Sequence, residues 1–164
     1  MPVISILQKG HVERNFDCDN HALNDFFKKY AWQSQASNVS RTYVLSDGGE
    51  GLIGYYSLVY GSISPQDVAE RIKKGTGSYP LPIILIARLA IDKLFQGKGF
   101  GKALLKDALI RCLQASEIAG LRAVVVKAKD DRAKVFYEKF GFESSPFDEF
   151  HLFLLMKDLR KNFG

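Results

Sequence analysis

Hydrophobic residues follow two spacings along this chain, and together they predict alternating strands and helices. Helical stripes, with apolar residues three and four positions apart, begin near Asn20, Ser64 and Asp130 and after Gly101. The inner stripe of the first helix is Leu23, Phe26, Phe27, Tyr30 and Ala31, and that of the helix after Gly101 is Leu104, Leu105, Ala108, Leu109 and Cys112. Apolar runs typical of strands lie at Val3–Leu7, Thr42–Leu45, Leu52–Ile63, Ile83–Ile91, Arg122–Ala128 and Phe150–Met156. Neither a repeat nor a linker interrupts this mixture. The pattern therefore predicts a single domain over residues 1–164, of the α+β or α/β class with one sheet.

Local signals set the starts of the first two predicted helices. Asp19 or Asn20 can cap the first helix, because either side-chain oxygen can accept from the exposed N–H groups of its first turn. At the second helix Ser64 is expected to cap, Pro65 fits the first helical position, and Asp67 can close a capping box.

The strand Ile83–Ile91 and the glycine-rich turn after it form the most informative stretch. The strand is apolar on both faces except at Arg88, which is typical of a central strand. The turn Gln96-x-x-Gly99-x-Gly101 leads into a helix, whose first N–H groups have no intrahelical partner and can bind phosphate. The spacing fits neither the Rossmann fingerprint nor the P-loop. Taken alone, the turn indicates a phosphate site or a purely structural turn with equal weight.

Charge and cysteine content narrow the class of protein and its partners. The 164 residues carry 23 Lys and Arg against 18 Asp and Glu, a net charge of +5, which favours an anionic partner such as nucleic acid or an anionic cofactor. Cys18 and Cys112 lack metal-type spacing and are predicted to be reduced thiols rather than a disulfide. No stretch reaches membrane-spanning length, and the three histidines share no motif. We expect a cytoplasmic protein with no membrane contact and no metal site.

Three motifs in a fixed order resemble the GNAT family of acyl-CoA-dependent N-acetyltransferases. They are Arg88-Leu89-Ala90-Ile91-Asp92, Gln96-x-x-Gly99-x-Gly101 and Ala133-x-x-Phe136-Tyr137-x-x-x-Gly141-Phe142. The resemblance covers most of the chain. It implies the GNAT fold, which is a single twisted mixed β-sheet with helices on both faces, and acetyl-CoA as the co-substrate.

The resemblance also implies which residues hold acetyl-CoA. The turn of that family binds the CoA pyrophosphate through backbone N–H groups, and the pantetheine arm pairs with the strand that precedes it. The N–H of Ile91 is expected to polarise the thioester carbonyl. Asp131 stands where many relatives have Asn, and we expect no cofactor contact from it, because an ionised Asp cannot donate a hydrogen bond. The residues implied for the cofactor are Leu89, Ala90, Ile91, Gln96, Gly97, Lys98, Gly99, Phe100, Gly101, Lys102 and Phe136.

Tyr137 has two interpretations. Its position in the GNAT motif is that of the general acid that protonates the departing CoA thiolate, and a phenol with a pKa near 10 is protonated at neutral pH. Helical spacing alone makes it one more aromatic of the inner stripe that contains Phe136 and Phe140. No residue stands out as a general base. This favours an α-amine acceptor, because free α-amines titrate near 7.7–8.0 and lysine side chains near 10.4.

A narrower resemblance, to the GNAT toxins of bacterial toxin–antitoxin pairs, rests on four segments. These are Phe16-Asp17-Cys18-Asp19-Asn20, Ser40-Arg41-Thr42-Tyr43-Val44, Gly54-Tyr55-Tyr56-Ser57-Leu58 and Ile86-Ala87-Arg88-Leu89-Ala90. It implies acetylation of the α-amino group of an aminoacyl-tRNA, which blocks translation, together with a homodimer and a ribbon-helix-helix antitoxin. Two alternatives stay open. One is a GNAT enzyme acting on a small-molecule or protein amine, and the other is a CoA- or nucleic-acid-binding module without turnover.

Basic residues are the candidates for contact with tRNA, because ionic contacts to phosphates supply most non-specific affinity. Each of them could equally be an ordinary solvated side chain. Arg88 differs, since a cation in an apolar strand is costly unless it is paired, and it either pairs with a carboxylate or faces the substrate. The other candidates are Lys28, Lys29 and Arg41 near the first helix, and Arg71, Lys73 and Lys74 on the second.

Overall fold

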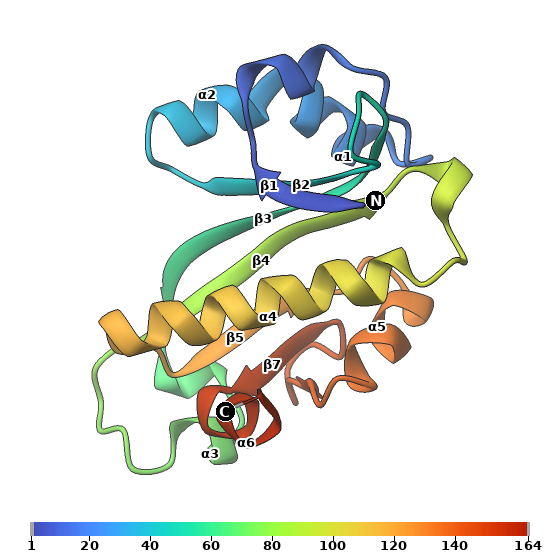
Figure 1. Cartoon of the computed structure of the whole chain (residues 1–164). Helices are drawn as coiled ribbons and strands as arrows, with labels where there is room; N and C mark the ends of the chain where they lie inside the picture. Colours follow the sequence, from blue (N-terminus) through green and yellow to red (C-terminus); the bar gives the residue numbers. More distant parts are fainter. Residues whose placement is uncertain (1, 164) are drawn as a thin grey trace. The chain divides into compact units, whose positions relative to one another are not determined.

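The computed structural model describes residues 2–163 and contains one seven-stranded sheet with helices (Figure 1). The strands are β1 Val3–Ile6, β2 Arg41–Ser46, β3 Leu52–Ile63, β4 Leu81–Ile91, β5 Ala123–Lys127, β6 Glu143–Ser144 and β7 His151–Leu155. The helices are α1 His21–Asp25, α2 Ala31–Ala36, α3 Glu70–Lys73, α4 Phe100–Ile118, α5 Asp131–Glu138 and α6 Met156–Phe163. A π-helical turn lies at Phe26–Tyr30, and 3-10 turns lie at Lys9–Glu13, Pro65–Asp67 and Lys93–Phe95.

The sheet has the strand order β1-β2-β3-β4-β5-β7-β6 and is mixed. Strand β2 is antiparallel to β1 and β3, and β7 is antiparallel to β5 and β6. Strands β4 and β5 are neighbours joined through α4, the kind of crossover by which parallel neighbours are connected. The predicted single mixed sheet is confirmed, and the predicted strand Leu52–Ile63 has the bounds of β3.

The chain forms two compact units. The N-terminal unit comprises residues 2–59 and Ile86–Ala108, and the C-terminal unit comprises Tyr60–Leu85 and residues 109–163. Strands β3 and β4 and helix α4 each contribute residues to both units. The expectation of one domain over residues 1–164 remains a prediction.

In the N-terminal unit, a continuous helical run from α1 through the π-helical turn to α2 covers one face of the strands (Figure 1). Asn20 is the residue that caps this run, since its side chain accepts from the N–H of Leu23 at 3.1 Å. The predicted inner position of Tyr30 is wrong, because its side chain is 59% exposed. The π-helical turn changes the angular spacing of the side chains and rotates Tyr30 outward. The core on this face comprises Leu7, Phe16, Cys18, Phe26, Phe27, Ala31, Val44, Leu52, Tyr55 and Ala90.

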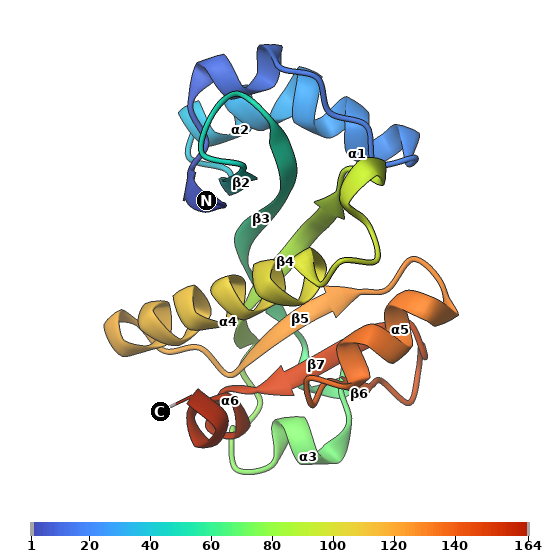
Figure 2. The same cartoon turned by 45° about the vertical axis from the view of Figure 1, so that its right-hand side comes forward.

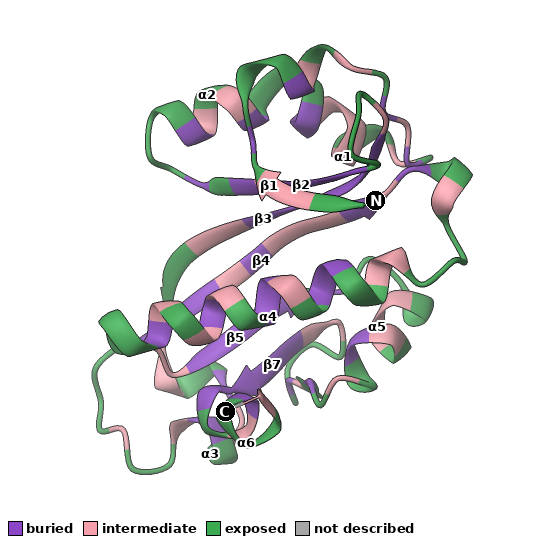
Figure 3. Ribbon diagram, in the orientation of Figure 1, coloured by how far each residue is buried: buried purple, intermediate pink, exposed green. Residues whose placement is uncertain are grey.

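In the C-terminal unit, β5 and β7 lie side by side (Figure 2) and are buried along nearly their whole length (Figure 3). The predicted continuous helix from Ser64 is wrong. Residues Pro65–Asp67 form one 3-10 turn, no side chain caps it, and α3 begins only at Glu70. The break lies at Val68, which has extended backbone and is buried in the core of this unit. Burial of this side chain outweighs the local helix signals.

The C-terminal end of the chain also differs from the prediction. The predicted strand Phe150–Met156 ends one residue earlier, and helix α6 begins directly at Met156. Met156 and Leu159, three positions apart, form the buried side of this helix. The two-residue strand β6, which pairs with β7, was too short to produce a periodic signal.

Gly54 allows a close approach of strands β3 and β4 in the N-terminal unit. A Cβ atom at this position would lie 2.6 Å from the carbonyl oxygen of Ala90 and 2.7 Å from Cδ1 of Ile91. We expect Gly54→Ala to lower the free energy of unfolding by about 1–3 kcal/mol, because overpacking forces the backbone to shift. Urea or thermal denaturation measures the loss.

Gly61, on the same strand, provides the matched control. The nearest atom to a Cβ there is Cγ1 of Ile83 at 3.6 Å, which is ordinary contact. Gly61→Ala is expected to change the stability by less than about 0.5 kcal/mol. Equal losses for the two variants would show that the approach of β3 to Ala90 does not depend on the missing side chain.

Candidate active site

The turn between β4 and α4 exposes backbone amides in a conformation that depends on glycine. Gly97 has a φ of 77° and Gly99 a φ of 86°, in the left-handed region that other residues rarely adopt. A Cβ atom on either glycine would meet no other atom within 4 Å, so the space beside the turn is open. The N–H of Ala103 donates to Gly99, and the amides just before it belong to the first helical turn, which leaves them without an intrahelical acceptor. This arrangement fits an anionic group such as a pyrophosphate.

Gln96 holds this turn against the end of β4. Its side-chain amide donates to the carbonyl oxygen of Ile91 at 2.9 Å and to that of Cys18 at 3.3 Å. The predicted role of Gln96 as a cofactor-binding residue remains a prediction. The side chain positions the turn relative to the strand that carries Leu89, Ala90 and Ile91.

Two carboxylates that the sequence analysis missed join the same end of β4 to the segment before α1. Asp92 is buried and accepts from the N–H of Leu94 at 2.9 Å and from the N–H of Asp17 at 3.1 Å. Asp17 accepts from the N–H of Asp19 and the amide of Asn24, and it forms an ion pair with Lys93 at 3.2 Å. These hydrogen bonds and the charge of Lys93 lower the pKa of Asp17 to about 2.

The N–H of Ile91 points away from β3. The next residue, Asp92, donates its N–H to the carbonyl of Ile53 at 2.8 Å, so its backbone faces β3. Backbone groups of successive strand residues point to opposite sides, and those of Leu89 and Ile91 therefore face away from β3. This orientation suits the predicted pairing with a pantetheine arm.

Arg88 packs against an aromatic ring rather than a carboxylate, and the other expectation, that it faces the substrate, stays a prediction. Its guanidinium carbon lies 3.5 Å from the centroid of the Phe26 ring, a cation–π contact. Among residues 2–163, no carboxylate lies within ion-pair distance of it. The side chain is half-buried, and this desolvation lowers the pKa of Arg88 from its ordinary value. The predicted carboxylate partner is therefore absent from the part of the chain that the structure describes.

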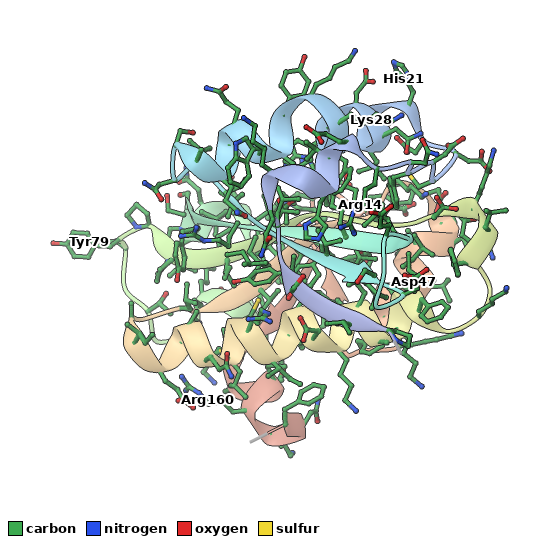
Figure 4. The ribbon with its side chains drawn as sticks, turned by 45° about the horizontal axis from the view of Figure 1, so that its top comes forward. Arg14, His21, Lys28, Asp47, Tyr79 and Arg160 are labelled. Atoms are coloured by element: carbon green, nitrogen blue, oxygen red, sulfur yellow. The ribbon has the colours of Figure 1, made fainter. Side chains whose placement is uncertain are left out.

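The remaining basic candidates fall into two groups. In the N-terminal unit Lys28 (Figure 4) and Arg41 are exposed, and Nζ of Lys29 lies 3.6 Å from Oδ1 of Asp25. In the C-terminal unit two of the three candidates are engaged within the chain. Arg71 forms ion pairs with Glu143 and Asp158, and Lys73 forms one with Glu70.

Tyr137 is buried on α5 of the C-terminal unit. Its ring centroid lies 5.2 Å from that of Phe136 and 5.6 Å from that of Phe142, so the stripe interpretation describes its packing correctly. No hydrogen bond of its hydroxyl is formed with residues 2–163. Burial raises the pKa of Tyr137 to about 12, so the phenol is fully protonated at neutral pH. Asp130 caps this helix by accepting from the N–H of Ala133 at 2.8 Å.

The site residues are thus divided between the two units. The N-terminal unit contains Arg88 to Ile91 and the glycine turn from Gln96 to Lys102, and it brings these together with Phe26. Tyr137 and Phe136 belong to the C-terminal unit. Lys98 and Lys102 are exposed, and the ammonium of Lys98 lies 5.8 Å from the Phe95 ring centroid.

Metal-binding clusters, membrane-spanning helices and cysteines are the remaining features of residues 2–163 that bear on function. Residues 2–163 contain no group of three or more His, Cys, Asp or Glu side chains placed to hold a metal ion. Over the same residues, no helix is both long and apolar enough to cross a bilayer. The Cys18 and Cys112 side chains are both buried thiols, and burial raises the pKa of Cys112 to about 12.

Two bacterial proteins named as toxins are similar in sequence to this chain over most of its length. A tRNA-acetylating toxin of Mycobacterium tuberculosis is 41% identical over 150 residues, which cover 92% of this chain and 89% of that protein. The probable toxin TacT of Sinorhizobium fredii is 29% identical over 165 residues, which cover 94% of this chain and 90% of that protein.

Two solved structures have a fold similar to that of this chain over nearly its whole length. AtaT complexed with acetyl-methionyl-tRNAfMet has a TM-score of 0.90 and 26% identity over the whole of both chains. A mutant of KacT has a TM-score of 0.89 and 26% identity over 99% of each chain. The family model for the acetyltransferase (GNAT) domain matches residues 38–144. The chain belongs to the GNAT acetyltransferase family.

Proposed function

We propose that this protein is a toxin that transfers the acetyl group of acetyl-CoA to the α-amino group of an aminoacyl-tRNA and thereby blocks translation. The observation that carries this proposal is the 41% identity, over 92% of the chain, to a protein named as a tRNA-acetylating toxin. The structural match to AtaT, solved with an acetylated methionyl-tRNA, supports the same substrate class.

The cofactor side of the site uses backbone groups of the N-terminal unit. Acetyl-CoA, as bound in the solved structure of AtaTR, supplies an activated acetyl thioester. We propose that the amides from Gly97 to Lys102 hold its pyrophosphate, that Leu89 to Ile91 hold its pantetheine arm, and that Lys98 and Lys102 add positive charge. The N–H of Ile91, which faces away from β3, stabilises the negative charge that develops on the thioester oxygen.

The proton required at the leaving group comes from Tyr137. The acceptor nitrogen forms a bond to the acetyl carbon, the carbon–sulfur bond breaks, and the phenol gives its proton to the sulfur. The proton lost by the amine then restores the phenol, so the step balances. The hydroxyl has no competing acceptor among residues 2–163, which leaves it available for this transfer.

The substrate and partners follow from the same proposal. Lys28, Lys29 and Arg41, together with Arg88, are the proposed contacts to tRNA. A mutant of AtaT has been solved with the C-terminus of the antitoxin AtaR, and we propose that this chain also has an antitoxin, of the ribbon-helix-helix type, and acts as a homodimer. Because its substrate takes part in translation, its proposed location is the cytoplasm.

The pH dependence of kcat/KM distinguishes the ionisation of the acceptor amine from that of Tyr137, the proposed acid. We expect kcat/KM with charged tRNA to rise with pH until the α-amine is neutral, at or below about pH 8, and then to stay level to about pH 9.5. Tyr137 does not limit this range, because a group with a pKa of about 12 keeps its proton throughout it. A pH profile corrected for hydrolysis of the aminoacyl ester measures this. A falling limb within the range would contradict the assignment of the acid.

The same pKa shift predicts the sign of an effect on stability. The pKa of Tyr137 is higher in the folded protein than the ordinary value of 10. This group therefore leaves the free energy of unfolding unchanged below pH 10 and lowers it as the pH rises from 10 through about 12, because the phenol ionises first in the unfolded chain.

Inhibition of cell-free translation tests the proposed function. The purified protein should stop translation only when acetyl-CoA is supplied, and fresh charged tRNA should restore it. Inhibition without acetyl-CoA would favour a binding module without turnover. Absence of inhibition, with acetyl transfer to a small amine, would favour the other enzyme class.

A further inference from the structure

Arg88 is a half-buried cation in the N-terminal unit, and its donors form no hydrogen bond or ion pair with residues 2–163. Its guanidinium lies over the Phe26 ring, and no carboxylate of residues 2–163 is within ion-pair distance. Contact with a ring uses the face of a guanidinium, and its N–H donors lie in its plane. Arg88 therefore retains a planar set of donors that can bind a two-oxygen anion.

Aromatic packing fixes the position of this cation. The Phe26 ring stacks on Tyr55 with a centroid distance of 6.3 Å, and Tyr55 is fully buried. The Tyr55 hydroxyl donates to the carbonyl of Leu23 at 2.6 Å, which joins the stack to helix α1. A cation held in this way loses little additional freedom when it binds a ligand.

The site of Arg88 is separate from the glycine turn. A Cβ atom on Gly54 would contact both Ile91 and Leu104, so the Ile91 side chain and α4 share one face of the sheet. Side chains alternate along a strand, which places Arg88 with Ala90 on the opposite face, beside Phe26. An anion bound at the start of α4 is therefore not the partner of Arg88.

We propose that Arg88 binds the last phosphodiester of the aminoacyl-tRNA, the one that joins the terminal adenosine to the preceding nucleotide. This inference rests on the proposed function. Arg88 precedes Ile91 by three residues, about 10 Å along a strand. The α-amine and the phosphate of the terminal nucleotide are separated by eight bonds, at most about 10 Å. An amine at the thioester thus leaves the phosphate within reach of the guanidinium.

Neutralising this one phosphate tests the inference. Charged tRNA is prepared with a neutral methylphosphonate at the last linkage, and kcat/KM for acetylation is compared with that of ordinary charged tRNA. For the unmodified protein we expect ordinary tRNA to be better by about tenfold to a hundredfold. For Arg88→Met we expect a ratio of about 1, because the charge pair is already lost.

Two further variants sharpen the comparison. Arg88→Lys keeps the charge but not the planar fork, so we expect an intermediate ratio. Arg160→Met, which removes an exposed arginine of α6 (Figure 4), should retain the ratio of the unmodified protein. A methylphosphonate one linkage further from the amine should give the same ratio with and without Arg88.

The outcomes separate this inference from the proposed function. If charged tRNA is acetylated, two results would show that Arg88 does not bind this phosphate. One is that Arg88→Met retains the full preference for ordinary tRNA over methylphosphonate tRNA, and the other is that the unmodified protein shows no such preference. If charged tRNA is not acetylated at all, the proposed function fails and the inference fails with it.

Discussion

Replacing Tyr137 by phenylalanine should lower kcat by about a hundredfold to ten-thousandfold while acetyl-CoA binding stays within about threefold of the unmodified protein. The ring is buried against Phe136 and Phe142, and phenylalanine keeps this packing. The hydroxyl forms no hydrogen bond with residues 2–163, so its removal leaves no buried partner unsatisfied. The variant thus removes the proton donor and little else. Single-turnover kinetics and calorimetric titration with acetyl-CoA measure the two effects.

Tyr79 provides the control for this substitution. Its side chain is 81% exposed and projects from the loop after α3 (Figure 4), so Tyr79→Phe should leave both quantities unchanged. If Tyr137→Phe turns over at a rate close to that of the unmodified protein, Tyr137 is not the acid and serves only in packing the inner stripe of α5. A parallel loss of acetyl-CoA binding would show that the hydroxyl serves the cofactor.

Replacing Gly99 by alanine should weaken acetyl-CoA binding by about a hundredfold. The φ of 86° is unfavourable for alanine, so the turn must relax and the amides after it lose their alignment. Loss of one or two charge-assisted hydrogen bonds gives an effect of this size. Calorimetric titration with CoA and acetyl-CoA measures it.

Gly75 separates backbone strain from cofactor binding. It has a φ of 80°, and a Cβ atom there would meet nothing within 4 Å, as at Gly99. Gly75→Ala and Gly99→Ala should therefore lose similar stability, about 1 kcal/mol each. Only Gly99→Ala should lose affinity for acetyl-CoA. Equal affinities in the two variants would remove the turn from the cofactor site.

The parts of the fold that were predictable have strong periodic signals. Strand β3 and the inner stripe of α4, formed by Leu104, Leu105, Ala108, Leu109 and Cys112, agree with the prediction, and all five stripe residues are fully buried. The glycine turn was also predictable, because its spacing and the helix after it are local features. Family membership followed from motifs of the same kind.

The remaining features depend on contacts between distant parts of the chain. Arg71 was expected on a basic surface, but Glu143 and Asp158, 72 and 87 residues away, pair with it. Asp17 and Asp92 belong to motifs recognised in the sequence, but their structural role could not be predicted, because their hydrogen bond joins segments 75 residues apart. The cation–π contact of Arg88 could not be predicted, because the sequence does not reveal that Phe26 lies beside β4. Helix periodicity also could not reveal the π-helical turn that exposes Tyr30.

The central claim is tested most directly by following the acetyl group. The protein is incubated with labelled acetyl-CoA and a pool of charged tRNA, and the aminoacyl end is released and analysed. The proposed function predicts label on the α-amino group of the esterified amino acid and none on uncharged tRNA. With Tyr137→Phe the rate of label transfer should fall by about a hundredfold or more. Label on polyamines or on protein lysines, with charged tRNA unmodified, would contradict it.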